Sequence, residues 1–519
     1  MKNFIFFILV MFFGTNLFSQ TLVWKDSSSN GGGTASTLPI FTVISGNEIF
    51  VVKEKRTPSS NLLIRKISQN GAFIYEKTPF IDNIVSYNQA VSDNNGNILV
   101  TGYISNSFSG GSGGFLLKIS NDGNFVWKKM SQYSNYDILA DTSGYYVLAY
   151  NQNPALCIVY KYDFNGVILW EKYFPQSNDI CDAKISFDKA GKILIGITVK
   201  NTGLYIAKME KSGFETWNLL VPSNVSYKNK IANITFDNQN NLFIECSTLL
   251  NTESICSIVK ISSNGNLLNN VTTNFFNGEN EEILGGNVNQ TGNPFIFVRN
   301  YDSTSATKKL LLALYDNNCN LLWFKNIDSS NLYANIVKNN SICSNNINDI
   351  CISYSKTAVS GNDTSIIKTF NSNGVLINSI TLNKRIPASV LYNNSGNLIA
   401  TFYYNPNGSV WDTFIYNYNL NTGITQIGSS IPEKFSLLQN YPNPFNPVTN
   451  IRFTIQKTDF VKLRIFNSLG KEVQQLANQN LNAGEYEISF DASGLTSGVY
   501  FYRLETENFT DTKRMILLK

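Results

Sequence analysis

The sequence DNNGNILVTGYISNSFSGGSGGFLLKISNDGNFVWKKM, residues 93–130, shows a pattern that recurs along most of the chain. Turn signals at Asn95-Gly96 and Asp122-Gly123, with a Gly/Ser-rich loop between them, separate three short apolar runs, and no helix caps are present. Short apolar runs between tight turns are typical of antiparallel strands. This part of the chain is therefore predicted to be all-β.

Eight copies of the pattern can be followed through two turn positions. The first turn falls at Gly46, Gly96, Gly144, Gly191, Asn240, Gly292, Asn348 and Gly396, and the second at Gly71, Gly123, Gly166, Gly213, Gly265, Cys319, Gly374 and Gly423. Successive first turns are 47 to 56 residues apart, so the period is about 50 residues. Such a period with four short strands, here called A to D, is the signature of a β-propeller blade.

Two side-chain types keep a fixed place in these units. A Lys ends strand C five residues before the second turn, at Lys66, Lys118, Lys161, Lys208 and Lys260. A large ring follows four residues after the turn, at Tyr75, Trp127, Trp170, Trp217 and Trp323. We predict that each ring packs its D strand onto the neighbouring blade.

The segment Thr21–Asp26 (TLVWKD) matches Asn124–Lys129 (NFVWKK), so the mature chain is expected to begin with an unattached D strand. Pairing of this strand with the last blade would close the ring and cover an exposed sheet edge. Eight A-B-C-D units follow it, and eight blades are predicted. Seven is the alternative, because the fifth and seventh D strands, 266–271 and 375–380, lack the large ring.

The repeat resembles the seven- and eight-bladed propellers of secreted bacterial proteins whose blades carry D-x-x-G-N-hydrophobic-x-V-T-G. The best-matching positions are Asp93, Gly96, Asn97, Val100, Thr101 and Gly102. The resemblance covers residues 21–430. It implies a binding scaffold, but the ligands of such repeats are varied or unknown, so the resemblance supports the fold more than the function.

The composition excludes several functional classes. The net charge is only +4 and charged residues make up 15% of the chain, against roughly 25% in typical soluble domains. Without a basic patch we expect no nucleic-acid partner. There is no histidine, which removes His-dependent triads and His-ligated metals. The acid at turns such as Asp188–Gly191 is explained by the turn itself rather than by calcium, so no metal or cofactor is expected.

The amino terminus has the features of a secretory signal peptide. Lys2 is its only charge, the apolar run 4–13 is too short for a membrane span, and Gly14 and a polar segment follow. We predict cleavage after Ser19, with a buried helix as the alternative, and no transmembrane segment. The protein is thus expected to leave the cytoplasm.

Seven cysteines match no zinc or redox motif: Cys157, Cys181, Cys246, Cys256, Cys319, Cys343 and Cys351. Most are interpreted as small buried hydrophobic residues. Cys246 and Cys256 lie on successive strands and Cys343 and Cys351 flank a turn, so either pair is a candidate disulfide in an oxidising compartment.

A different composition begins at Ile431. Four prolines, Pro432, Pro442, Pro444 and Pro447, predict a stiff hinge over 431–448 that leads into a second module. Six short alternating runs between 449 and 519 predict a small Ig-like β-sandwich. The predicted divisions are a signal peptide (1–19), a propeller (20–430), the hinge and start of the module (431–448), and the module itself (449–519).

This module is similar to the type A carboxyl-terminal sorting domain of the type IX secretion system. The resemblance rests on LLQNYPNPFNPVTNIRFTI (437–455), VKLRIFNSLGKEV (461–473), AGEYEISFDASGLTSGVYFYRL (483–504) and KRMILLK (513–519). The motif positions are Tyr441, Pro442, Asn443, Pro444, Phe445, Asn446, Pro447, Gly470, Gly498, Tyr500, Lys513 and Arg514. The resemblance implies two partners: type IX secretion machinery, which carries the passenger across the outer membrane, and a surface sortase, which removes the domain. The passenger is then expected to be secreted or attached to the outer cell surface. The terminal strand is a place where a receptor could add a strand.

Ligands of propellers usually bind around the central channel, near the connections from strand D to strand A. Those connections hold the candidate ligand-binding residues Tyr133, Tyr136, Asp137, Asp179, Asp182, Glu279, Glu281 and Glu282. Three functions remain open: a non-enzymatic scaffold for a glycan, protein or peptide, a hydrolase using two of these carboxylates, and an envelope adhesion component. No catalytic residue is assigned.

Overall fold

The computed structural model describes residues 21–28, 36–56, 60–81, 86–104, 113–152, 155–175, 180–200, 202–222, 230–250, 253–276, 280–300, 309–328, 341–345, 348–357, 363–383, 385–393, 396–404, 412–419, 424–428, 432–457, 459–481, 483–492 and 495–518. The signal-peptide prediction lies outside these ranges. Regular structure in the described ranges is β throughout. A helix of the length and apolarity that a membrane crossing requires is not found among them.

The larger unit, Leu22–Tyr418, contains eight four-stranded antiparallel sheets. The first sheet consists of β2 (Ser36–Ser45), β3 (Glu48–Arg56), β4 (Ser60–Ser68) and β5 (Phe73–Ile81), and the second of β6 (Ser86–Ser92), β7 (Ile98–Ile104), β8 (Gly113–Ile119) and β9 (Phe125–Ser131). The third sheet consists of β10 (Ser134–Asp141), β11 (Gly144–Gln152), β12 (Ala155–Tyr162) and β13 (Ile168–Pro175), and the fourth of β14 (Ile180–Phe187), β15 (Ile193–Val199), β16 (Gly203–Met209) and β17 (Glu215–Pro222).

The fifth sheet consists of β18 (Lys230–Phe236), β19 (Leu242–Leu250), β20 (Glu253–Ile261) and β21 (Leu267–Thr273), and the sixth of β22 (Glu281–Val288), β23 (Pro294–Asn300), β24 (Leu310–Tyr315) and β25 (Leu321–Asp328). The seventh sheet consists of β26 (Ile342–Ser344), β27 (Ile350–Thr357), β28 (Asp363–Phe370) and β29 (Leu376–Asn383), and the eighth of β30 (Ile386–Tyr392), β31 (Leu398–Tyr404) and β32 (Asp412–Asn419) with β1 (Thr21–Ser28).

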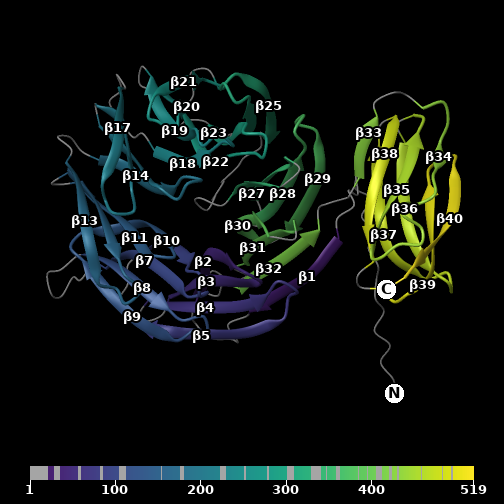
Figure 1. The fold of residues 1–519 in the computed structure, drawn as a ribbon, viewed down its shortest axis with the longest axis horizontal. Coiled ribbons are helices and arrows are strands. Elements are labelled where there is room, and N and C mark those ends of the chain that lie inside the picture. The colour runs from purple at the N-terminus through teal and green to yellow at the C-terminus, as the bar shows by residue number, and fades with distance from the viewer. Residues whose placement is uncertain are drawn as a thin grey trace. The chain divides into compact units, whose positions relative to one another are not determined.

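The eight sheets form a closed propeller (Figure 1). The first strand of each sheet contacts the first strand of the next, in the cycle β2, β6, β10, β14, β18, β22, β26, β30 and back to β2. The outer strands β5, β9, β13 and β17 follow the rim. The second strands are buried on both faces, as throughout β15, whereas the outer strand β17 alternates between partly buried and exposed residues. Eight blades, rather than seven, are confirmed.

The amino-terminal strand closes the ring, as predicted. β1 pairs with β32 and supplies the fourth strand of the eighth sheet. The strand after Gly423, which the repeat pattern places in that position, lies elsewhere: β33 (Ile424–Gly428) pairs with β38 (Gly484–Asp491) of the second unit. The reason is that β1 already occupies the place beside β32, so a second D strand has no edge left to join.

A lysine and an aromatic ring join each of several blades to the next, which confirms the predicted role of the ring. Lys208 Nζ and Trp217 Nε1 both donate to the carbonyl of Ser263 in the following sheet, each at 3.2 Å. Gly265 has a φ of +90°, and a Cβ there would lie 2.7 Å from the Trp217 ring. Only glycine can adopt this positive φ and leave room for the Trp217 ring without strain. Equivalent ring donors reach Asn121, Phe164, Lys211 and Ser372, from Tyr75, Trp127, Trp170 and Trp323 respectively.

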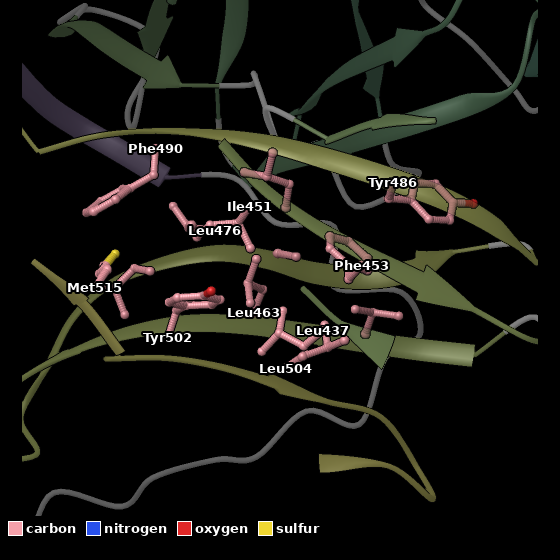
Figure 2. Close-up of a cluster of buried hydrophobic side chains, with 14 of the residues drawn as sticks. Leu437, Ile451, Phe453, Leu463, Leu476, Tyr486, Phe490, Tyr502, Leu504 and Met515 are labelled. Atoms are coloured by element: carbon pink, nitrogen blue, oxygen red, sulfur yellow. The ribbon is translucent and has the colours of Figure 1, made fainter. Parts of the chain in front are cut away.

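The second unit, which runs from Asn419 to the carboxyl terminus, is a sandwich of two four-stranded sheets. One sheet has the order β33-β38-β35-β34 and the other β37-β36-β39-β40. The strands not yet given are β34 (Ser436–Leu437), β35 (Val448–Ile455), β36 (Asp459–Asn467), β37 (Glu472–Leu481), β39 (Gly498–Glu505) and β40 (Thr510–Leu517). Side chains from both sheets meet in one apolar core, including Ile451, Phe453, Leu463, Tyr502 and Leu504 (Figure 2).

The proline-rich segment belongs to this sandwich, and the prediction of a rod-like hinge is wrong for its larger part. Leu437 pairs with Phe453, Tyr441 forms a bridge with Asn450, and Phe445 forms one with Leu517. Phe445 is only 2% exposed. Apolar side chains between the prolines therefore hold the segment against both sheets.

Candidate functional site

The innermost strands of the propeller share one irregularity near their start. Among the described strands, seven of the eight carry a register shift at corresponding positions: Pro39/Phe41, Tyr87/Gln89, Asn135/Asp137, Ile180/Asp182, Ile231/Asn233, Ile283/Gly285 and Pro387/Ser389. A bulge re-aims the side chains around it and raises the local twist. Four of the candidate ligand residues, Tyr136, Asp137, Asp182 and Glu282, lie at or next to such a bulge.

The polar residue that follows the bulge joins one sheet to the next. Asp137 Oδ2 accepts from the Ile185 N–H of β14 at 3.3 Å, and Asp182 Oδ2 accepts from the Ile231 N–H of β18 at 3.0 Å. Each Oδ1 accepts from the following residue's own N–H. Burial raises the pKa of Asp137, and the Lys184 charge partly opposes that rise. These two carboxylates are thus bound within the ring of innermost strands.

Glu281 and Glu282 begin β22 and also have partners. Glu281 is 1% exposed and accepts from the N–H groups of Phe275, Phe276 and Cys256, at 2.5, 2.9 and 3.2 Å. Burial raises its pKa, while those N–H groups lower it in part. Glu282 Oε2 accepts from Arg299 Nε and Nη2 at 2.8 and 2.5 Å. Asp179 and Glu279 lie outside the described residues.

The two tyrosine candidates lie on opposite faces of one sheet. Tyr133 packs between the second and third sheets, whereas Tyr136 packs between the third and fourth. The Tyr136 ring stacks on Tyr150 with centroids 3.7 Å apart. Burial raises the pKa of Tyr136, and the nearby charge of Asp182 adds to the rise. The structure therefore brings Tyr136 and Asp182 together and separates Tyr133 from them.

One buried acid was not among the predicted residues. Glu245 on β19 is completely buried, its Oε1 is 3.0 Å from Thr235 Oγ1, and its Oε2 has no hydrogen-bond partner. Burial raises its pKa to about 8, although the Lys184 charge acts in the opposite direction. The carboxyl is thus mainly protonated at neutral pH. Its signal in the sequence is an acid inside the apolar run 242–246.

In the sandwich, the proline-rich segment covers the outer edge of β40. Phe445 N–H donates to the Ile516 carbonyl, and the Leu518 N–H donates to the Phe445 carbonyl, each at 2.9 Å. Asn443 Oδ1 accepts from the Ile516 N–H at 3.0 Å, and Gln439 Nε2 donates to the Arg514 carbonyl at 2.8 Å. The Arg514 carbonyl, both main-chain groups of Ile516 and the Leu518 N–H are therefore occupied on the outer side of β40. This contradicts the expectation that a receptor adds a strand there, at least while the segment stays in place.

The same segment is tied down from inside the sandwich. Tyr502 OH donates to the Leu438 carbonyl at 2.8 Å and accepts from the Asn440 N–H at 2.7 Å. The side chains of Tyr500 and Tyr502 are both buried. Gly470 has a φ of +77° and closes the turn after Asn467.

The remaining motif residues are on the surface. Tyr441 is 81% exposed. Pro442, Asn443, Pro444, Asn446, Gly498 and Arg514 are also exposed, while Pro447 and Lys513 are partly buried. These residues lie on or beside the carboxyl-terminal strand β40.

Comparison with protein families identifies this unit. Residues 439–518 match the family described as the secretion system C-terminal sorting domain, so the chain carries a type IX sorting domain at its carboxyl end. The domain implies export to the cell surface or the medium. No curated protein matches the chain.

Several solved structures are similar to the chain at low identity. The Dos1 propeller has a TM-score of 0.47 at 10% identity, covering 77% of this chain and 95% of that one. A polysaccharide lyase of family PL25, an ulvan lyase, has a TM-score of 0.45 at 9% identity, covering 76% and 95%. The propeller domain of the Trilobed protease from Pyrococcus furiosus has a TM-score of 0.38 at 8% identity, covering 66% and 98%.

Proposed function

We propose that the sorting domain carries the propeller out of the cell through the type IX machinery, where the propeller acts as a non-enzymatic scaffold that binds a glycan, a protein or a peptide. In this proposal a signal peptide is removed after Ser19. A surface sortase then acts on the carboxyl-terminal domain, leaving the propeller released or attached to the outer surface. The proposed divisions are the propeller up to Tyr418 and the sorting unit from Asn419 onward, which includes β33 and the segment 431–448.

The bonding of the candidate carboxylates supports a scaffold rather than a hydrolase. A glycosidase needs one carboxyl free to donate a proton and a second free to attack or to activate water. Asp137, Asp182 and Glu281 already accept main-chain hydrogen bonds from strands of neighbouring sheets. Glu282 forms an ion pair with Arg299. These carboxylates therefore contribute to the packing of the propeller blades.

The proposed ligand contacts lie where the innermost strands bulge. Tyr136 offers a partly buried ring and Lys184, on the adjacent β14, a partly buried cation. Glu282 and Arg299 add a second polar pair on β22 and β23. Rings with a few polar groups around them are common in sites for sugars and peptides.

The secretion machinery is proposed to contact the exposed face of the sorting motif rather than the edge of β40. Tyr441, Pro444 and Arg514 are exposed there. Main-chain groups of the strand beneath them are already paired with Asn443 and Phe445. Side-chain recognition therefore needs no rearrangement, whereas strand addition does.

Binding and turnover assays on the purified full chain test the proposed function. We expect saturable binding to at least one member of a panel of neutral polysaccharides, acidic polysaccharides and peptides, without new reducing ends. Loss of a stacking ring in Tyr136→Ala should weaken binding about tenfold. Tyr173→Ala, on the exposed outer strand β13, should bind as wild type does.

Two other outcomes would each support a different function. New reducing ends with the wild type, lost in Asp182→Asn or Glu282→Gln, would establish the hydrolase. Absence of binding to every class, together with loss of cell adhesion when the chain is deleted, would favour the adhesion component.

A further inference from the structure

The seventh blade lacks the lysine and ring that join other blades. Thr369 and Asn378 hold the places that Lys208 and Trp217 hold in the fourth blade, since each pair is directly opposite in its sheet. Both side-chain amide atoms of Asn378 are buried without a hydrogen-bond partner, while Thr369 and Tyr392 of the next blade interact with each other. Unpaired buried polar atoms are costly. The joint after the seventh blade therefore lacks the lysine and ring hydrogen bonds that link the fourth blade to the fifth.

The innermost strand of the same blade is also short. β26 has three residues, against seven to ten in the other innermost strands. Within the described residues it pairs through Ile342, Cys343 and Ser344, and residues 329–340 before it lie outside the description.

Two cysteines face each other across that short pairing. Cys343 and Cys351 are directly opposite, so their side chains lie on the same face of the sheet. Ser353 N–H donates to the Ser341 carbonyl and Asn345 N–H to the Asp349 carbonyl, two residues on either side. The cysteines thus occupy a hydrogen-bonded antiparallel pair, in which Cα atoms lie about 5.5 Å apart. This Cα separation lies within the range of a disulfide, and the Cβ atoms, about 5.5 Å apart in such a pair, have to approach to about 4 Å when the bond forms.

The second candidate pair fails the same geometric requirement. Cys246 is opposite Ser257, and Cys256 is opposite Ser247. One residue of offset places their side chains on opposite faces of the sheet. A bond between them would need the strands to slip.

We propose that Cys343 and Cys351 form a disulfide once the chain has left the cytoplasm, and that this bond pins the short innermost strand of the seventh blade. Both residues are thiols in the structure. Bond formation removes one proton and one electron from each thiol, and a disulfide of a thiol oxidoreductase in the exporting compartment takes up both electrons and becomes two thiols. The inference rests on export, because cytosolic thiols stay reduced.

The sequence makes the bond easy to detect. Trypsin releases residues 339–356 as one peptide with these two cysteines alone, and residues 231–260 as one peptide with Cys246 and Cys256 alone. Peptide 231–260 also contains two cysteines and therefore serves as an internal control. The masses of both peptides are measured in the same digest.

The test uses the full chain from the outer fraction of a host with a type IX system, alkylated with N-ethylmaleimide under denaturing conditions before digestion. We expect peptide 339–356 unalkylated and two hydrogen atoms lighter than its reduced form, and peptide 231–260 alkylated twice. Two alkyl groups on 339–356 would overturn the proposal. The location of the chain is scored separately by immunoblot, so a failure of export is distinguished from a failure of the bond.

A second arm needs no export. The purified full chain is incubated with oxidised glutathione, and 339–356 is expected to close while 231–260 stays open. Reduction should then lower the urea midpoint of the wild type and leave that of Cys343→Ser unchanged. Closure of 231–260 instead, or no change in the wild-type midpoint on reduction, would contradict the assigned pairing or its role.

Discussion

Replacing Lys208 with methionine is expected to lower the free energy of unfolding of the propeller by about 3–5 kcal/mol, because it leaves a buried carboxylate without its cation. Lys208 Nζ lies 2.7 Å from Asp188 Oδ2, with side chains 8% and 0% exposed. Burial alone would raise the pKa of Asp188, yet hydrogen bonds from Lys208, from the Lys192 N–H and from Asn240 lower it overall. Methionine keeps the apolar stem and removes only the charge and its hydrogen bonds.

Tryptophan fluorescence during urea unfolding measures this loss in the propeller alone, since all six tryptophans precede Asn419. Lys192→Met is the matched control: its ion pair with Glu210 has a similar length, 2.6 Å, but is more than a third exposed on both sides. That variant should lose at most about 1 kcal/mol. Equal losses in the two variants would show that burial of the Lys208 pair has no special weight.

Replacing Glu245 with glutamine is expected to stabilise the propeller above pH 8 by several kcal/mol and to have little effect at pH 5. The folded-state pKa is raised to about 8, above the value near 4.3 of a carboxyl in an unfolded chain. The folded state therefore holds the proton more tightly than the unfolded state, and wild-type stability is largest at low pH. It falls as the pH rises from about 4.5 through about 8.

Urea midpoints between pH 5 and pH 9 measure the difference. The wild-type curve should decline over this range, while Glu245→Gln should lack that contribution and cross above it. Glu210→Gln, at an exposed carboxylate, should follow the wild type. A Glu245→Gln variant that is less stable than the wild type at every pH would mean that the charged form is stabilised in the fold.

The repeat could be predicted because its signals are local. Turn residues such as Gly265 and rings such as Trp217 recur at fixed spacing, and each acts on its immediate neighbour in the ring. The fate of β33 could not be predicted, because it depends on competition with β1 for the edge of β32 across the whole chain. A run that fits the repeat does not show which sheet it joins.

The candidate site was predicted by position rather than by bonding. Asp182 was expected near the inner end of its blade and lies there, but its hydrogen bond to the Ile231 N–H follows from a bulge that no sequence signal marks. Glu245 was missed because strand patterns give weight to apolar residues. Likewise, four prolines predict stiffness, yet Phe445 between them decides that the segment packs on the sandwich.

The central claim is that the carboxyl-terminal unit is what takes the propeller out of the cell, and localisation tests it most directly. The full chain and a chain that stops at Tyr418, which keeps all eight sheets, are expressed in a host with a type IX system and followed by immunoblot of periplasm, cell surface and medium. The account predicts the full chain outside and the shortened chain in the periplasm. Recovery of the shortened chain outside the cell, at the level of the full chain, would contradict it.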